Sequence, residues 1–452
     1  MQDNEKLMLD ETIEMQSRQS EEKPTGEKSE KGPKLKADKH IWGIFITLCL
    51  ISIIELYSAS SREVASSAMG VYGPIVRHCM MLGMGVVIVI LLQRIHYKWF
   101  IPLIPVFAAV SAVMMIYVMF FGDIINGARR SFTLFGIMIQ PAEFLKLSAV
   151  LVIALVMSRT QMERGVKNVG VVICAVTVIF FGGLLFNQGL TNTILLMAIS
   201  LSMMLIGGVQ WKKFAVVLLA YGVVAGGALA VKMNSADERA IEVATANVNI
   251  DARKVADQRS GTWKARIERF MGDSIPKYDK TITAENRQEM YAYMAQANGG
   301  IFGVFPGNSR EAARLPLAFS DYIYSIIIED MGFIGGLFVL ILYLWLLARA
   351  GSIASRCSRA FPAMLVMGIS VMIAFQALFH MAIVTGVFPV SGQPLPLISK
   401  GGTSILITSI AFGIMLSVSK YAVRNNSKKQ EIKQELNALP ENVRAENPLL
   451  LK

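Results

Sequence analysis

Two acidic residues at the start of a long apolar run are the clearest candidates for chemistry in this sequence. Asp321 and Glu329 are eight residues apart, so on a helix they would share a face, with Glu329 about 12 Å further along the axis. A carboxylate in such a position can act as a general base toward a hydroxyl group. Asp321 could equally be a helix cap, because acidic residues at helix N-termini are favoured by the helix dipole. The residues alone leave both interpretations open.

A second charged pair opens another apolar run. Pro141 suits the first position of a helix, and Glu143 and Lys146 are three residues apart, which places them on one helix face. Arg130 stands shortly before this run and adds a further cation. Ionisable residues in membrane spans are costly and by default functional, but a pair near a helix end can also be a purely structural ion pair. Glu143 and Lys146 therefore either contact a substrate or form an ion pair that only stabilises the start of this helix.

The segment 389–404 joins two apolar runs and is rich in Pro and Gly, which excludes a regular helix. Its many apolar residues argue against a solvated loop, and irregular backbone at membrane depth survives only where protein buries it or where it lines a cavity. Gly401 and Gly402 precede a predicted helix, so their backbone amides could face an anion. A structural turn is the alternative.

The composition places these residues in a membrane protein. Of the 452 residues, 54% are hydrophobic and 17% are charged, and the mean hydropathy is +0.49, whereas soluble domains average about 25% charged residues. A membrane-spanning helix needs about 17–25 mostly apolar residues, and ten stretches meet this requirement. The sequence thus predicts an all-α polytopic membrane protein with spans near 41–59, 75–92, 100–121, 141–159, 169–186, 190–208, 213–231, 321–348, 361–385 and 403–423.

Lys and Arg residues gather in the loops on one side of these spans and in both tails, which predicts that both termini are cytoplasmic. The net charge of +11 then reflects topology rather than nucleic-acid binding. The four cysteines lack the spacing of a metal or redox site. We divide the chain into a flexible cytoplasmic tail (1–40), spans one to seven (41–231), a long external loop (232–320), spans eight to ten (321–423) and a second flexible cytoplasmic tail (424–452).

By this topology, Asp321 and the segment 389–404 lie toward the outer face, where neither ATP nor nucleotide sugars are available. An enzyme there needs a substrate that carries its own leaving group and arrives in the membrane, such as a lipid-linked sugar pyrophosphate. Cations such as Arg130, Lys146 or Lys400, or a bound Mg²⁺, could neutralise the departing pyrophosphate. The same features suit a transporter of such a lipid, and spacing alone does not separate the two functions.

Five motifs, in order and on matching spans, resemble the SEDS family of bacterial cell-wall proteins. Any one of them could arise by chance, whereas the ordered set is specific and covers nearly all of residues 41–423, apart from much of the external loop. The motifs are NGA-x-R ending at Arg130, QPAEFLKL at 140–147, NGGIFGVFPGNS at 298–309, LPLAFSDYIYSIIIEDMG at 315–332 and PVSGQPLPLISKGGTS at 389–404.

The resemblance implies a peptidoglycan glycosyltransferase that polymerises lipid II on the outer face of the bacterial cytoplasmic membrane. The catalytic role falls on Asp321, which would activate the acceptor hydroxyl for displacement of undecaprenyl pyrophosphate with inversion. The implied partners are a class B penicillin-binding protein and other divisome membrane proteins at the septum, and no nucleic acid is expected. No metal ligands are assigned, and the one cofactor left open is a divalent cation such as Mg²⁺. The expected substrate-binding residues are Arg130, Glu143, Lys146, Glu329, Ser399, Lys400, Gly401 and Gly402.

Several positions depart from the pattern usual in the family. Ser131 replaces a Trp, Lys400 a Tyr and His380 an Asn, and the turn 187–192 lacks the usual Asp, so we assign this turn no catalytic role. The long N-terminal tail and the segment 57–61 resemble the division member of the family more than the elongation member. A lipid II flippase, an elongation polymerase and a non-catalytic divisome scaffold remain as alternatives.

Overall fold

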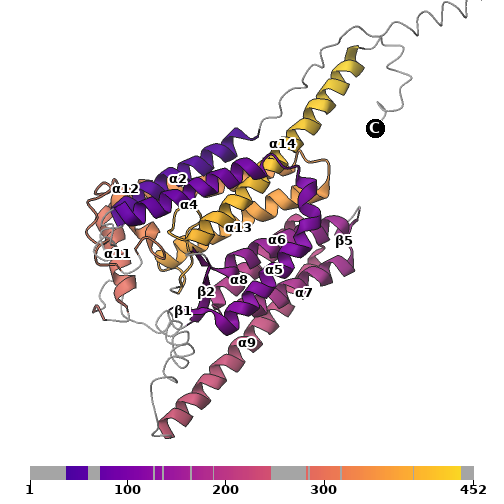
Figure 1. The fold of residues 1–452 in the computed structure, drawn as a ribbon. Helices are drawn as coiled ribbons and strands as arrows, with labels where there is room; N and C mark the ends of the chain where they lie inside the picture. The colour runs from indigo at the N-terminus through magenta and orange to yellow at the C-terminus, as the bar shows by residue number, and fades with distance from the viewer. Residues whose placement is uncertain are drawn as a thin grey trace, which may run out of the picture. The chain divides into compact units, whose positions relative to one another are not determined.

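The computed structural model describes residues 37–59, 72–125, 128–134, 137–162, 165–186, 188–245, 281–283, 286–315, 318–389 and 391–438, all within one compact unit that begins at Ala37. Figure 1 shows the helices that dominate this unit. They are α2 (Lys39–Ala59), α4 (Tyr72–Leu92), η1 (Tyr97–Trp99), α5 (Phe100–Phe121), α6 (Pro141–Arg159), α7 (Asn168–Phe186), α8 (Leu190–Ile206), α9 (Trp211–Thr245), α11 (Arg287–Gly299), α12 (Ile323–Ala354), α13 (Ala360–Val384) and α14 (Gly402–Ala438).

The predicted all-α membrane fold is confirmed, and a helix lies at each of the ten predicted spans. Within the described residues, nine helices are long and apolar enough to cross a membrane, and the tenth, α8, is an apolar helix of 17 residues. Lipid offers no partner to backbone N–H and C=O groups, so an apolar run of this length forms a helix that satisfies them internally. The chain is therefore a multi-pass membrane protein.

Two helices are longer than the sequence predicted. Helix α9 continues to Thr245, past the predicted span end at 231, and α14 continues to Ala438 through the first half of the predicted flexible tail. Both extensions consist largely of helix-favouring Ala, Glu, Lys, Arg and Gln, and α14 ends two residues before Pro440. Helix propensity, and not lipid burial, accounts for these additional turns.

Short strands form outside the spans. Strands β1 (Asp123–Ile125), β2 (Ala128–Leu134) and β3 (Ile137–Ile139) make an antiparallel meander between α5 and α6, and β4 (Gln161–Met162) pairs with β5 (Gly165–Val166) in the turn before α7. These strands were not predicted. The meander places Arg129 beside the end of α5, where its guanidinium donates to the backbone oxygens of Met119 and Phe120.

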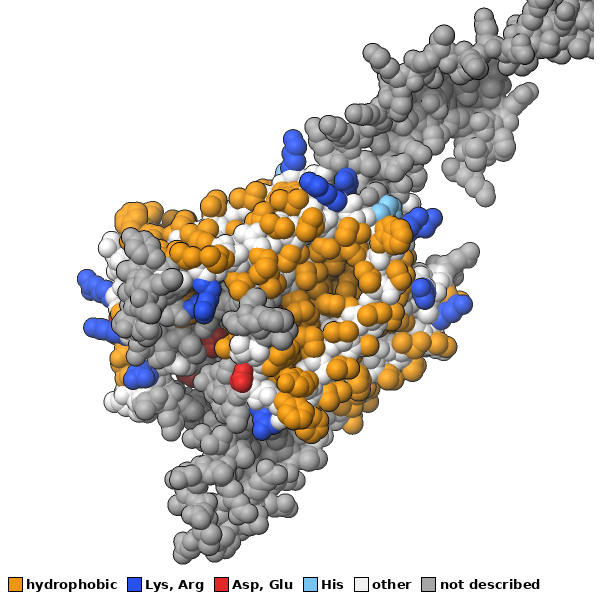
Figure 2. Space-filling model, in the orientation of Figure 1, with side chains coloured by type: hydrophobic (Ala, Val, Ile, Leu, Met, Phe, Trp, Pro, Cys, Tyr) orange, Lys and Arg blue, Asp and Glu red, His pale blue; other side chains and the backbone are white. Residues whose placement is uncertain are grey.

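Helices α13 and α14 run through the middle of the described helices (Figure 1). Helix α13 packs against α6, α8 and α12, and α14 packs against α4 and α6. By contrast, α4, α5 and residues 211–228 of α9 turn most of their side chains outward. Figure 2 shows the resulting apolar surface, with Lys and Arg side chains mainly toward its two ends, as expected of a surface that lipid covers.

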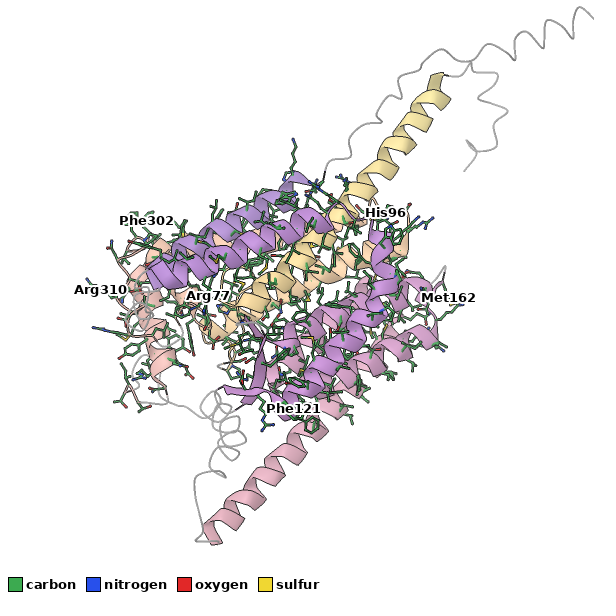
Figure 3. All side chains as sticks on the ribbon, viewed as in Figure 1. Arg77, His96, Phe121, Met162, Phe302 and Arg310 are labelled. Carbon is green, nitrogen blue, oxygen red and sulfur yellow. The ribbon has the colours of Figure 1, made fainter. Side chains whose placement is uncertain are left out.

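Loops predicted on opposite sides of the membrane lie at opposite ends of the helices. Figure 3 places Phe302 and Arg310 of the external loop at one end, and His96 and Met162, from two predicted cytoplasmic loops, at the other. The alternation of the spans is thus as predicted. Which end faces the cytoplasm stays a prediction from the distribution of Lys and Arg.

Candidate functional site

Asp321 lies in a turn before α12 and not on the helix. Helix α12 begins at Ile323, and Tyr322 occupies the N-cap position. The prediction that Asp321 and Glu329 share a helical face is therefore wrong, because only Glu329 is helical. The N-cap position considered for Asp321 belongs to Tyr322. Asp321 is partly exposed.

The carboxylate of Asp321 lies directly against Gly392. A Cβ atom at position 392 would lie 2.9 Å from Oδ2 and 3.4 Å from Cγ of Asp321, closer than a carbon atom tolerates. The absence of a side chain at Gly392 therefore gives Asp321 its present orientation. These two residues are 71 positions apart in the sequence, and their contact brings the acid onto the irregular segment 391–400.

The far end of this segment holds the residues that precede Asp321. The hydroxyl of Ser399 donates to the carbonyl of Ser320 over 2.7 Å and accepts from the backbone amide of Leu395, also over 2.7 Å. The amide of Lys400 donates to the carbonyl of Phe319 over 2.8 Å, and the Lys400 ammonium lies 4.5 Å from the centre of the Phe319 ring. Ser399 is only 1% exposed, so the structure places it as a bridge within the protein.

Segment 391–400 is itself fixed by side chains from four helices. Its irregular backbone is thus buried in protein, as the sequence predicted, and Leu397 adopts the left-handed conformation within it (φ 65°). The fixing contacts are Ser52 to the Ile398 carbonyl (2.9 Å), Tyr343 to the Pro396 carbonyl (2.6 Å), the His380 ring to the Gln393 carbonyl (2.6 Å) and the Gln393 side chain to Asn192 (2.9 Å).

Glu143 and Lys146 form the ion pair that their spacing predicted. Lys146 Nζ lies 2.7 Å from Glu143 Oε1, and Gln376 of α13 donates to Glu143 Oε2 over 2.9 Å. The Lys146 side chain is fully buried and that of Glu143 is 8% exposed. Gln376 and His380 are four residues apart on α13, so one helix face contacts both this ion pair and segment 391–400.

The start of α14 lies beside the start of α6. The amide of Gln140 donates to the hydroxyl of Thr403 over 3.3 Å, and Gly401 and Gly402 are partly exposed at this point. Arg130 is partly buried on β2, which leads toward the same helix start. The structure thus gathers the start of α6, the start of α14 and segment 391–400 around α13.

Glu329 organises the external residues 298–311. Its carboxylate accepts hydrogen bonds from the hydroxyl of Ser309 and from the amides of Arg310 (3.0 Å) and Glu311 (3.3 Å). Glu329 is fully buried, so these donors replace the water that a carboxylate needs. Burial also raises the pKa of the neighbouring Glu311, while Arg314 opposes this shift and the charge of Glu329 adds to it.

Backbone contacts join the same external residues to α12 where this helix is broken. Gly332 is non-helical (φ 71°, ψ −175°), and next to it the Phe333 amide donates to the Gly300 carbonyl over 2.9 Å. A Cβ at Gly332 would lie 2.1 Å from the Ile301 carbonyl oxygen, so only glycine permits this approach. Residues 323–331 therefore form a short, buried half-helix between Asp321 and the external loop.

Two further acids are buried deeper. Glu55 of α2 and Asp330 of α12 are 0% and 1% exposed and lie near enough for their charges to repel. Among the described residues, neither oxygen of Glu55 has a hydrogen-bond partner. Glu55 and His380 are ionisable residues within predicted spans, which makes each a weaker candidate, either a satisfied interior polar group or a functional one. Gln376, Gly392 and Gln393 were missed as individual residues. A lone glutamine in the apolar run 361–385, four residues before His380, was the available signal for Gln376.

The described residues bring no three His, Cys, Asp or Glu side chains together in a way that could hold a metal ion. A divalent cation held wholly by protein side chains thus does not fit this site, and we derive no step through one. The chemistry that the site does support is proton transfer by Asp321 beside a cationic Lys400 and the amide-rich start of α14.

Fold and site together define a polytopic helical membrane protein with a partly exposed acid, Asp321, held at one end of its spans. The family model FTSW_RODA_SPOVE, described as "Cell cycle protein", matches residues 38–424. The chain belongs to this family, which is the SEDS family that its motifs resemble.

Named relatives agree with this assignment. The chain is 28% identical over 381 residues to "Probable peptidoglycan glycosyltransferase FtsW" of Trichlorobacter lovleyi, covering 83% of this chain and 91% of the relative. It is 24% identical over 394 residues to "Peptidoglycan glycosyltransferase MrdB" of Escherichia coli K12, with coverages of 85% and 94%. Both relatives are thus matched over nearly their full length.

Solved structures share the fold. The rod shape determining protein RodA of Thermus thermophilus aligns with a TM-score of 0.57 at 21% identity, covering 85% of this chain and 97% of that chain. A chain from the structure described as "Structural coordination of polymerization and crosslinking by a peptidoglycan synthase complex" aligns with a TM-score of 0.64 at 20% identity, covering 86% and 99%.

Proposed function

We propose that this protein is a peptidoglycan glycosyltransferase that polymerises lipid II at the outer face of the bacterial cytoplasmic membrane, with Asp321 as general base. Family membership and the names of the two relatives support the reaction class. The observation that carries the assignment to Asp321 is that this partly exposed acid lies in a turn held by both Gly392 and Ser399 of segment 391–400.

In the proposed reaction, Asp321 accepts the proton of an acceptor sugar hydroxyl as that oxygen bonds to the anomeric carbon of the donor. The bond between this carbon and the pyrophosphate oxygen breaks, and undecaprenyl pyrophosphate leaves with the electron pair. A single carboxylate acting as base predicts inversion at the anomeric carbon. Lys400 and the amides at Gly401 and Gly402 are placed to offset the charge of the leaving group. A binding role for Arg130 is part of the same proposal, whereas the buried Glu143, Lys146, Glu329 and Ser399 would support the site from within the protein.

A role in septal wall synthesis is the second part of the proposal. Relatives named FtsW are 26–28% identical to this chain and the relative named MrdB is 24% identical, which supports the division role over elongation. A class B penicillin-binding protein and other divisome proteins would be its partners, with both termini in the cytoplasm. Fluorescent fusions that gather at midcell would support this role, and an even distribution along the side wall would contradict it.

The test of the enzymatic function is formation of glycan chains from purified lipid II by the protein together with its penicillin-binding partner. Wild type, Asp321→Asn and Asp123→Asn would be compared at equal folded concentrations, because Asp123 is an exposed carboxylate on β1 to which the proposal gives no role. We expect polymer from wild type and Asp123→Asn and none from Asp321→Asn. Polymer from Asp321→Asn would exclude Asp321 as the base. Transport of lipid II across vesicles without any polymer would favour the flippase.

A further inference from the structure

We infer that Gly392 and Ser399 are positioning residues that set the orientation of the Asp321 carboxylate for proton transfer. This inference rests on the proposed role of Asp321 as general base. It differs from the expectation for Ser399, which the sequence placed among the substrate-binding residues. It also gives a role to Gly392, to which the sequence motifs assign none.

Ser399 determines where the backbone before Asp321 lies. Its hydroxyl has one proton, which it donates to the Ser320 carbonyl, and it accepts the Leu395 amide with a lone pair. Both bonds are 2.7 Å long and the side chain is buried, so the proton of the hydroxyl is committed to a partner within the protein. Ser399 therefore acts on the substrate only through the peptide that leads into Asp321.

Gly392 determines where the side chain of Asp321 lies. The Asp321 carboxylate occupies the space that a Cβ at position 392 would need, with Oδ2 only 2.9 Å from that point. Gly392 does not have the left-handed backbone conformation, so an alanine can adopt its φ and ψ angles. A Gly392→Ala protein should therefore fold normally, and the carboxylate, which is the far end of a short side chain, would rotate away.

The remainder of segment 391–400 holds Gly392 and Ser399 in the positions from which they contact Asp321 and Ser320. His380 and Asn192 hold Gln393, next to Gly392, while Tyr343 holds the carbonyl of Pro396. The segment thus links α8, α12 and α13 to the turn that carries the base. Support of this kind is needed because a displacement of the base by about 1 Å can cost about 100-fold in rate.

The experiment measures glycan polymerisation as kcat and KM for lipid II, together with Tm, for Gly392→Ala and Ser399→Ala. Gly43→Ala is the matched control for the first, because a Cβ at Gly43 meets no atom within 4 Å. Ser202→Ala is the control for the second, because the Ser202 hydroxyl bonds only within its own helix, to Ala198. Asp321→Asn is assayed in parallel.

We expect Gly392→Ala to lower kcat about 10- to 100-fold, with wild-type Tm and KM, and both controls to match wild type. Ser399→Ala should lower kcat as well, with a lower Tm because it removes the hydrogen bonds to the Ser320 carbonyl and the Leu395 amide. A wild-type kcat for Gly392→Ala, with or without a raised KM, overturns the positioning role. If Asp321→Asn is inactive in the same assay, the role of Asp321 as general base still stands. An active Asp321→Asn overturns the proposed function and this inference together.

Discussion

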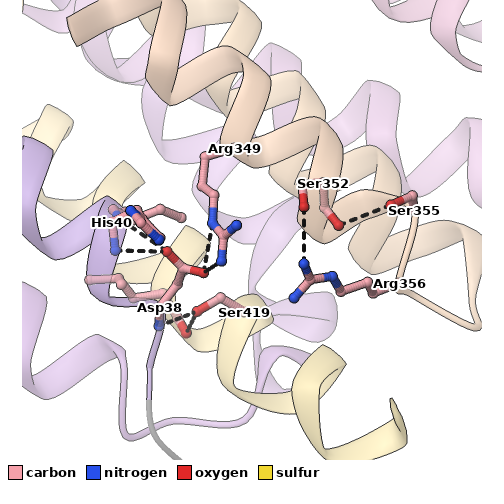
Figure 4. A network of polar contacts seen from close by, with 9 residues as sticks. Asp38, His40, Arg349, Ser352, Ser355, Arg356 and Ser419 are labelled. Atoms are coloured by element: carbon pink, nitrogen blue, oxygen red, sulfur yellow. Dashed lines mark hydrogen bonds and ion pairs between the residues drawn. The ribbon is translucent and has the colours of Figure 1, made fainter.

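Arg349 donates two hydrogen bonds to a single oxygen of Asp38, from Nε over 2.9 Å and from Nη2 over 2.6 Å, although the two residues are 311 positions apart (Figure 4). Asp38 immediately precedes α2, and Arg349 lies near the end of α12. The Asp38 amide also donates to the Ser419 hydroxyl on α14 over 3.2 Å. One acidic residue thus connects three helices at the end opposite to Asp321.

The stability that Asp38 provides should depend on pH. Burial raises the pKa of Asp38, but the hydrogen bond and charge of Arg349 and the amides of Ile41 and His40 outweigh burial and leave the pKa below its usual value. A lowered pKa means that the contribution is complete above the unfolded value of about 3.9 and is lost as pH falls through the lower folded value. We expect Asp38→Asn to lower the free energy of unfolding by about 1.5–3 kcal/mol at pH 7.

Thermal unfolding of wild type and Asp38→Asn from pH 7 down to pH 3 measures this contribution. The difference in Tm should be largest at pH 7 and should shrink below pH 4. The exposed Asp123→Asn variant serves as control, with no change at any pH. A constant difference across the whole range would mean that the charge of Asp38 is not what stabilises the helices.

The buried ion pair on α6 can be tested by restoring charge balance. Lys146→Met leaves Glu143 with Gln376 but without its cation, which should lower the free energy of unfolding by about 3–5 kcal/mol. Adding Glu143→Gln should recover most of this loss, because no uncompensated charge then remains. Since the two charged groups are buried and engage each other, we expect the double variant to regain most of the polymerisation as well. Recovered stability without recovered activity would instead show that these charges act on the substrate.

Removing Glu329 should release the external residues 298–311. Glu329→Ala deprives Ser309 and the amides of Arg310 and Glu311 of their acceptor, and we expect a loss of at least about 2 kcal/mol. Hydrogen–deuterium exchange followed by mass spectrometry should show faster exchange at residues 304–312. Asn308→Ala, which removes one exposed hydrogen bond to Val304, is the control within the same stretch. Unchanged exchange in Glu329→Ala would mean that backbone contacts to the break in α12 suffice.

Glu55 should be a site where a substitution raises stability. Its carboxyl is buried without a hydrogen-bond partner among the described residues, and Asp330 lies nearby. Glu55→Met keeps the length of the side chain and removes two unsatisfied oxygens, so we expect the free energy of unfolding to rise by about 1–3 kcal/mol. Glu55→Asp retains the carboxyl and should give no gain. A lower Tm for Glu55→Met would show that the carboxyl has a stabilising partner.

The sequence determined the spans and the local pairings. Continuous apolar runs of sufficient length predicted all ten helices, because lipid forces each such run to satisfy its own backbone. The first turn of α6 was also predictable, with Pro141 at its start and Glu143 paired with Lys146, because residues three apart meet on a helix whatever surrounds them. The irregular character of segment 389–404 followed from its Pro and Gly residues for the same local reason.

Only the tertiary structure decided how the acids are used. The contact of Asp321 with Gly392, the bridge from Ser399 to Ser320 and the binding of Gln376 to Glu143 each join residues at least 71 positions apart. No local period encodes such contacts, since they depend on which helices pack together. The same holds for Glu329, which resembled a second acid of the site and instead anchors the external loop. Chemical type and spacing identified the candidates, and packing assigned their roles.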